Sequence, residues 1–278
     1  MNSKQSLKSL PRTLMYLTTI AFGLMGLALF LAPDWTAANF AWKISPLVAM
    51  TMGGWYLGSA VMAGQVAHHR RWGLIYASSL YVGAFSVTEA AVLLIHQAKL
   101  KLDALLAWPY IGMLALALLA SLFVIIDWLR QRPALADEGQ SKPAWVHAVN
   151  LLFVVFVFFL AGVAFSGYWV GLNGVIFPEP LSLFTLHSFG AFYFSVAFST
   201  IPLLRAQRLA TFTVHIWGGF VLILLITVAA LVYIESFDFA QHPFQSIYLG
   251  VYLGALLVTL LYLFWFGRAR RTSRAAGE

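Results

Sequence analysis

Long apolar stretches alternate with short polar segments along the whole chain. A helix needs roughly 20 mostly apolar residues to cross the hydrocarbon core of a bilayer. Charged residues, prolines or both separate eight stretches of about this length, which predicts eight transmembrane helices in an all-α integral membrane protein. The predicted spans are residues 14–32, 46–67, 72–95, 105–129, 148–165, 181–204, 209–234 and 246–266.

The loops between these spans differ in their basic residues. When alternate loops are grouped, fourteen of the 17 Lys and Arg residues fall on one side of the membrane and three on the other. Cytoplasmic loops carry the excess of Lys and Arg. We therefore expect both termini in the cytoplasm (N-in, C-in) and place the protein in the cell membrane, meaning the plasma or bacterial inner membrane.

Composition supports lipid as the medium of folding. Hydrophobic residues make up 61% of the 278 positions, charged residues only 10%, and the mean hydropathy is +0.83. The net charge of +7 lies in short loops and a tail rather than on one folded face, so the sequence predicts no nucleic-acid partner. The absence of cysteine excludes disulfides and thiolate metal sites.

The two halves of the sequence resemble each other. Residues 53–60 and 190–197 both read Gly, small, aromatic, Tyr, bulky, small, any, Ala, and Tyr110 and Arg130 match Tyr248 and Arg268. The offset between matched residues grows in order from 132 to 137 and 138, as expected after a duplication with one insertion. We predict two tandem parallel four-helix repeats, 1–130 and 146–278, joined by a cytoplasmic linker at 131–145 and related by a pseudo-two-fold axis along the membrane normal.

Small residues predict where helices approach closely, because helices in lipid gain no hydrophobic attraction from each other. The second and eighth spans each contain Gly-x-x-x-Gly, at 54–58 and 250–254. We expect the tightest contacts between the second and sixth spans and between the fourth and eighth.

Four ionisable residues lie at bilayer depth: Glu89, Asp127, His187 and His215. Such groups are functional-site candidates because their burial in lipid is costly. Asp127 is expected to pair with Arg130 at the membrane interface and to be structural. Glu89 and His187 fall at the same depth in different halves, which predicts a contact between them across the repeat interface. The ordinary alternative is that a neighbouring Ser, Thr or Tyr satisfies each of them.

The depth of the histidines in the membrane also bears on cofactors. Haem ligation by two histidines requires both at one level, but His187 falls in the outer half of the membrane and His215 in the inner half. His96, at the outer end of the third span, would meet His187 only by reaching down about a helical turn. We therefore predict no cofactor and no metal ion.

The sequence supports three functional hypotheses. The first is a protein that binds or transports a small, largely apolar molecule at the repeat interface, with Glu89, His187, Tyr56 and Tyr193 as binding residues. The second is a structural or accessory subunit, with other membrane subunits or a second copy of the chain as partners. The third, an intramembrane enzyme that uses Glu89 as acid or base, lacks a nucleophile or metal set, so the sequence does not indicate an enzyme.

Overall fold

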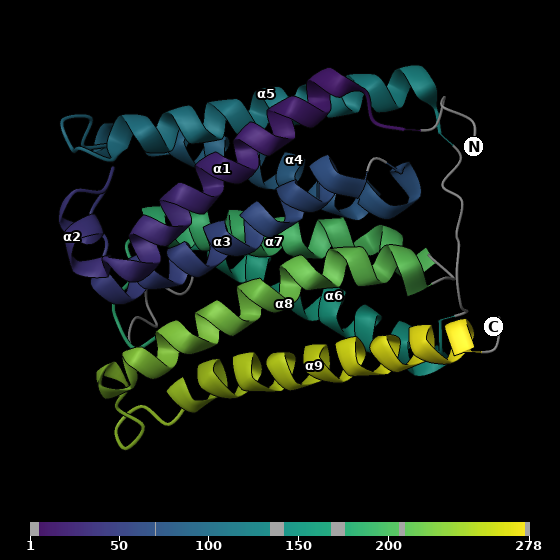
Figure 1. Cartoon of the computed structure of the whole chain (residues 1–278). Helices are drawn as coiled ribbons and strands as arrows, with labels where there is room; N and C mark the ends of the chain where they lie inside the picture. Colours follow the sequence, from purple (N-terminus) through teal and green to yellow (C-terminus); the bar gives the residue numbers. More distant parts are fainter. Residues whose placement is uncertain (1–5, 70, 134–141, 168–175, 206–208, 276–278) are drawn as a thin grey trace.

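The computed structural model describes residues 6–69, 71–133, 142–167, 176–205 and 209–275, and helices form nearly all of the regular structure in this part of the chain (Figure 1). The all-helical prediction is confirmed, although residues 134–141 of the predicted linker lie outside the described residues. The helices are α1 (Ser9–Leu31), α2 (Pro33–Ala38), α3 (Pro46–His69), α4 (Trp72–Ile95), α5 (Ala107–Gln131), α6 (Ala144–Ser166), α7 (Leu183–Arg205), α8 (Leu209–Val232) and α9 (Gln245–Ala275).

Seven of these helices are long and apolar enough to cross a membrane, and α7 is not among them. α7 is 23 residues long, but it carries His187, several Ser and Thr residues and Pro202. Most of its Ser and Thr side chains are buried, since α7 packs against both α6 and α4. The seven apolar helices indicate a multi-pass membrane protein.

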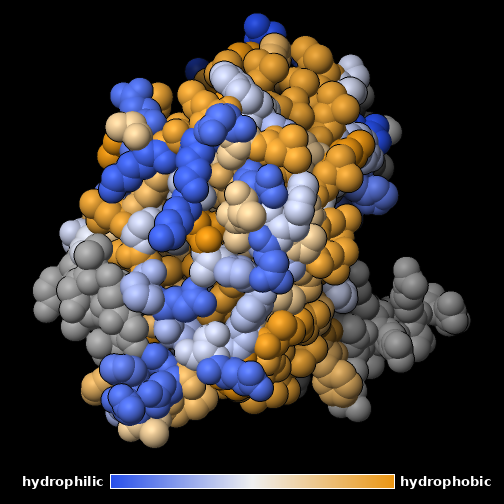
Figure 2. All heavy atoms as spheres, turned by 90° about the vertical axis from the view of Figure 1, so that its left-hand side faces the viewer, coloured by the Kyte–Doolittle hydropathy of each residue, from blue (hydrophilic) through white to orange (hydrophobic). Residues whose placement is uncertain are grey.

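The bundle has two distinct ends. The terminal end is where α1 begins and α9 ends, and the α2 end, at the left of Figure 1, holds α2 and the turns Gln97–Lys99 and Ile234–Ser236. Hydrophilic residues lie across the middle of the α2 end and hydrophobic residues gather along much of its margin (Figure 2). Polar ends and apolar flanks are the surface expected of a protein that spans lipid.

Three helix pairs join the first half (α1–α5) to the second half (α6–α9), and α4 with α8 is the smallest of them. α3 packs along α8, and α4 packs along α7. The expectation that the spans now seen as α3 and α7, and as α5 and α9, would make the tightest contacts is wrong. The reason lies on α3, where a Cβ atom added at Gly58 would lie only 2.5 Å from the Leu222 Cβ, so this glycine stripe faces α8.

The core lies where the two halves meet. Among the seven candidate spans, the most apolar stretch of α3 is 83% buried inside the protein, whereas that of α9 is only 22% buried. Large aromatic side chains fill the centre, including Trp42, Trp55, Tyr56 and Tyr110, each at most 2% exposed. α3 is therefore the central helix, and α9 lies at the periphery.

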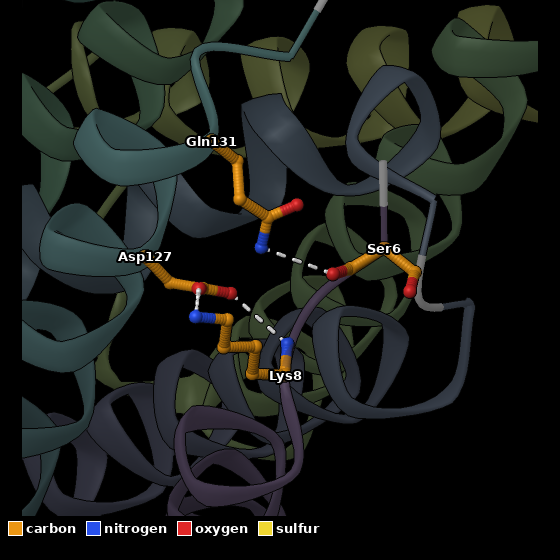
Figure 3. Close-up of polar contacts among 4 residues, drawn as sticks. All are labelled: Ser6, Lys8, Asp127 and Gln131. Carbon is orange, nitrogen blue, oxygen red and sulfur yellow. Dashed lines mark hydrogen bonds and ion pairs between the residues drawn. The ribbon is translucent and has the colours of Figure 1, made fainter. Parts of the chain in front are cut away.

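The start of the chain is fixed to the end of the first half (Figure 3). The backbone N–H of Lys8 donates to Asp127 Oδ2 at 2.9 Å, and Lys8 Nζ lies 3.8 Å from Asp127 Oδ1. Gln131 Nε2 also donates to the Ser6 carbonyl at 3.1 Å. Asp127 is structural, as expected, but the partner that the structure gives it is Lys8 rather than Arg130.

Candidate functional site

Glu89 lies on the face of α4 that meets both α5 and α7. Its side chain is 1% exposed. Tyr110 from α5 donates a hydrogen bond to Glu89 Oε1 at 2.7 Å, and Ser188 from α7 donates to the same oxygen at 2.9 Å. The carboxyl group therefore binds a residue from each half of the protein.

The hydrogen-bond chain extends to α3 and stops at one carboxyl oxygen. The Tyr56 hydroxyl donates to the Tyr110 hydroxyl at 2.8 Å. We call Glu89, Tyr110, Tyr56 and Ser188 the Glu89 cluster. Glu89 Oε2 is buried and has no hydrogen-bond partner among the described residues. A buried acceptor without a partner is costly. This oxygen is therefore the one position in the cluster that is open to a further hydrogen-bond donor.

Aromatic rings enclose the Glu89 cluster. Phe22 and Phe85 each lie 5.7 Å from the Tyr56 ring, measured between ring centroids. Phe40 and Trp42, which precede α3, pack edge-on against Tyr110 at 5.1 and 5.3 Å. The segment 40–42 is thus buried over Tyr110. The surroundings suit an apolar molecule rather than a hydrophilic one.

The predicted contact between Glu89 and His187 is not formed. His187 Nδ1 lies 3.0 Å from His96 Nε2, so the two imidazoles are hydrogen-bonded to each other. The ring of His96 also stacks on Phe184 with centroids 4.8 Å apart. It is Ser188, the next residue along α7, that reaches Glu89.

Tyr193 lies in a separate polar contact of the second half. Its hydroxyl is 3.2 Å from the hydroxyl of Tyr252 on α9, and the structure does not bring it to Glu89. Of the four predicted binding residues, only Glu89 and Tyr56 therefore belong to one cluster.

His215 lies on α8, away from the His96–His187 pair. Its Nδ1 is 3.2 Å from the Ser78 hydroxyl on α4, and its Nε2 is 3.5 Å from the Ser199 hydroxyl on α7. Serines from two neighbouring helices thus satisfy this histidine. The arrangement is that of a structural polar contact between α4, α7 and α8.

Sequence reasoning missed Tyr110 and Ser188 as partners of Glu89. A signal was present for Tyr110, because it belongs to the matched positions of the two halves, and its hydroxyl needs a partner when buried. For Ser188 the sequence offers only its position beside His187. Within the described residues, no three His, Cys, Asp or Glu side chains are grouped to hold a metal ion.

The chemistry open to the Glu89 cluster is hydrogen bonding in an apolar setting. One carboxyl oxygen accepts two donors from the protein, and the other is available to a third donor. Tyr110 and Ser188 are the described residues that hydrogen-bond the carboxyl group, and neither is paired with a base or a further acid that would make the site catalytic. Comparison with family models, curated proteins and solved structures found no match for this chain.

Proposed function

We propose that this protein binds or transports a small, largely apolar molecule between its two halves, with Glu89 as the polar anchor. The observation that carries the proposal is the buried Glu89 Oε2, which has no hydrogen-bond partner among the described residues. A ligand with one hydroxyl or amine group would donate to this oxygen, and its apolar part would lie among the aromatic rings of the site. Rings such as Phe85 and Trp42 supply that environment.

The site lies where a ligand would affect both halves. Glu89 belongs to α4, and Ser188, which binds it, belongs to α7 across the interface. Because Glu89, Ser188, Tyr56 and Tyr110 are each at most 1% exposed, entry of a ligand requires the two halves to move apart. Binding coupled to such a movement is the elementary step of a transporter that works by rocking one repeat against the other.

The test is photolabelling with a mid-chain diazirine alkyl alcohol in lipid vesicles. Labelled peptides are expected to come from the parts of α4, α5 and α7 around Glu89. Glu89→Gln keeps an oxygen that accepts from Tyr110 and Ser188 but replaces the open acceptor, so labelling there should fall about tenfold. Asp127→Asn, which changes another buried carboxyl group far along α5, is the matched control and should leave labelling unchanged.

Equal labelling of the native protein and Glu89→Gln, confined to side chains exposed on the outside of the bundle such as Leu94 and Leu257, would contradict the proposal. It would favour the second candidate function, a structural or accessory membrane subunit. The observation that favours this candidate is the closed packing of the Glu89 cluster, which suits a brace between the halves. Native mass spectrometry after mild extraction tests it, because a stable monomer without partners would exclude an accessory role.

We further propose that α7 is an eighth span and that the halves are tandem parallel repeats. Two residues related by a two-fold axis touch each other only at the axis. Trp55 and Phe192, which match in the sequence repeat, stack with ring centroids 4.4 Å apart and planes 5° apart. Ser78 and His215, separated by the same offset, are hydrogen-bonded. Both contacts support a pseudo-two-fold axis between the halves.

Contacts away from the proposed axis support the same two-fold relation between the two halves. A Cβ at Gly54 of α3 would lie 3.1 Å from Leu225 of α8. The positions that match these two in the repeat are Ala191 of α7 and Thr88 of α4, and the Thr88 hydroxyl lies 3.5 Å from the Ala191 carbonyl. A two-fold axis would exchange the α3–α8 pair with the α4–α7 pair in this way.

The orientation follows from the charges. Arg12, Arg71, Arg130 and Arg205 lie at the terminal end of the bundle, whereas Lys99 lies at the α2 end. On the rule that basic residues stay in the cytoplasm, we propose that the terminal end faces the cytoplasm of a cell or inner membrane, with both termini inside. Labelling of a single cysteine introduced at Lys99 but not at Arg130 by an impermeant maleimide on intact cells is the expected result.

A further inference from the structure

The His96–His187 contact joins the two halves at the α2 end. His96 caps the C-terminus of α4, where its backbone N–H donates to the Val92 carbonyl. His187 lies in the first turns of α7. Their hydrogen bond, at 3.0 Å, is a direct side-chain contact between these helix ends, about two turns along α4 from Glu89.

Among the described residues, no negatively charged side chain acts on the two rings. Phe184 of α7 stacks on His96, and the backbone of Phe165, at the end of α6, has a hydrogen-bonding interaction with the His187 ring. The charged group that acts on both rings is Lys99, from the turn that follows α4. A second positive charge at this contact would therefore face the Lys99 cation, with no carboxylate among the described residues acting on the rings to offset it.

Protonation decides whether the bond exists. A hydrogen bond between two imidazoles needs one N–H and one bare nitrogen. One added proton is tolerated, because an imidazolium still donates to a neutral ring. A second added proton places two N–H groups and two positive charges face to face at hydrogen-bonding distance, so the bond is lost and the rings repel each other.

We propose that His96 and His187 form a pH-sensitive latch, which holds the α2 ends of α4 and α7 together at neutral pH and releases them in acid. Release separates the two halves next to the Trp42–Phe184 stack, whose rings lie 4.2 Å apart. The latch is a property of helix packing, and it operates whether or not a ligand binds at Glu89.

The direction of the pH dependence follows from proton linkage. Burial, then His187 and then Lys99 lower the pKa of His96 below its ordinary value of 6.5. The closed latch thus binds protons more weakly than the open one, and lowering the pH favours the open form. Above 6.5 the latch has its full stability, and this stability is lost as the pH falls below that value.

The experiment uses the absence of cysteine from the chain. Leu186→Cys introduces a single thiol in the first turns of α7, at a side chain that is 3% exposed when the latch is closed. Leu94→Cys, at a position 69% exposed on α4, reports the intrinsic pH dependence of thiol reactivity. The ratio of the two maleimide labelling rates should rise about tenfold between neutral pH and about pH 5, a typical size for conformational coupling.

Two sets of variants test the cause. His96→Gln and His187→Gln, made singly and together in the Leu186→Cys protein, should remove the rise because glutamine does not titrate. Lys99→Gln changes an exposed side chain, and it should move the midpoint of the rise to higher pH because a repelling charge is gone. A flat ratio in the native background, or a rise that persists in the double glutamine variant, would overturn the proposal.

Discussion

Helices α3 and α9 carry the same Gly-x-x-x-Gly spacing in opposite surroundings. On α3, a Cβ added at Gly58 would lie 2.5 Å from Leu222 Cβ and 3.0 Å from its Cα, and one added at Gly54 would lie 3.1 Å from Leu225. On α9, a Cβ at Gly250 or Gly254 would meet nothing within 4 Å. The motif allows two helix backbones to approach each other. Whether a second helix packs against it depends on how deeply the whole helix is buried in the bundle.

The same contrast extends to the other faces of α3. Gly53 faces α1, where an added Cβ would lie 2.6 Å from the Phe30 backbone nitrogen. α3 thus uses glycine toward two neighbours at once, whereas the described glycines of α9 face open space. Three comparisons between the helices test this difference.

The largest loss of stability is expected for substitution of Gly53. Gly53→Ala places a methyl group against the backbone of α1, which no side-chain rotation relieves, and overpacking of this kind costs about 3 kcal/mol. The free energy of unfolding, measured by SDS titration in mixed micelles, should fall by about this amount. Gly254→Ala is the matched control on α9. Equal stability of the two variants would mean that α1 and α3 are not in close contact.

A smaller effect is expected for the buried tyrosines of the two helices. Tyr56→Phe removes a 2.8 Å hydrogen bond to Tyr110 within the Glu89 cluster and should lower the free energy of unfolding by about 1 kcal/mol. Tyr252→Phe on α9 removes a longer contact, 3.2 Å from Tyr193, and should lower it by about half as much. The reverse order in the same titration would contradict the central position of α3.

The smallest change in stability, a slight gain rather than a loss, is expected for Gly254→Ala. Alanine has a higher helix propensity than glycine, by up to about 1 kcal/mol in soluble helices, and here the added methyl group meets open space. Gly254→Ala should leave the thermal unfolding temperature unchanged or raise it slightly. A clear loss of stability, concentration-dependent in detergent, would instead show that this face of α9 binds another chain.

The fold was largely predictable because hydropathy reports the helices directly. Residues 72–95 were predicted as a span and are the bounds of α4. The short helix α2 was missed, since Pro33 and Asp34 were interpreted only as a break, although proline is favoured in the first turn of a helix. α7 was predicted as a span despite a polarity that keeps it out of the seven apolar helices.

The candidate site was only partly predictable, because depth along a helix is easier to infer than direction around it. Glu89 was recognised from its depth alone. His187 and Ser188 differ by one residue in depth but by about 100° around α7. Because of this rotation, Ser188 points toward Glu89 and His187 points toward His96. Hydropathy alone does not indicate the direction of either side chain.

The attachment of Lys8 and Ser6 to α5 has a consequence for how the protein is made. The partners of the chain start, Asp127 and Gln131, lie in the last turns of the fifth helix. Both contacts therefore form only once α5 has been made, and they link residues 119 and 125 positions apart in the sequence.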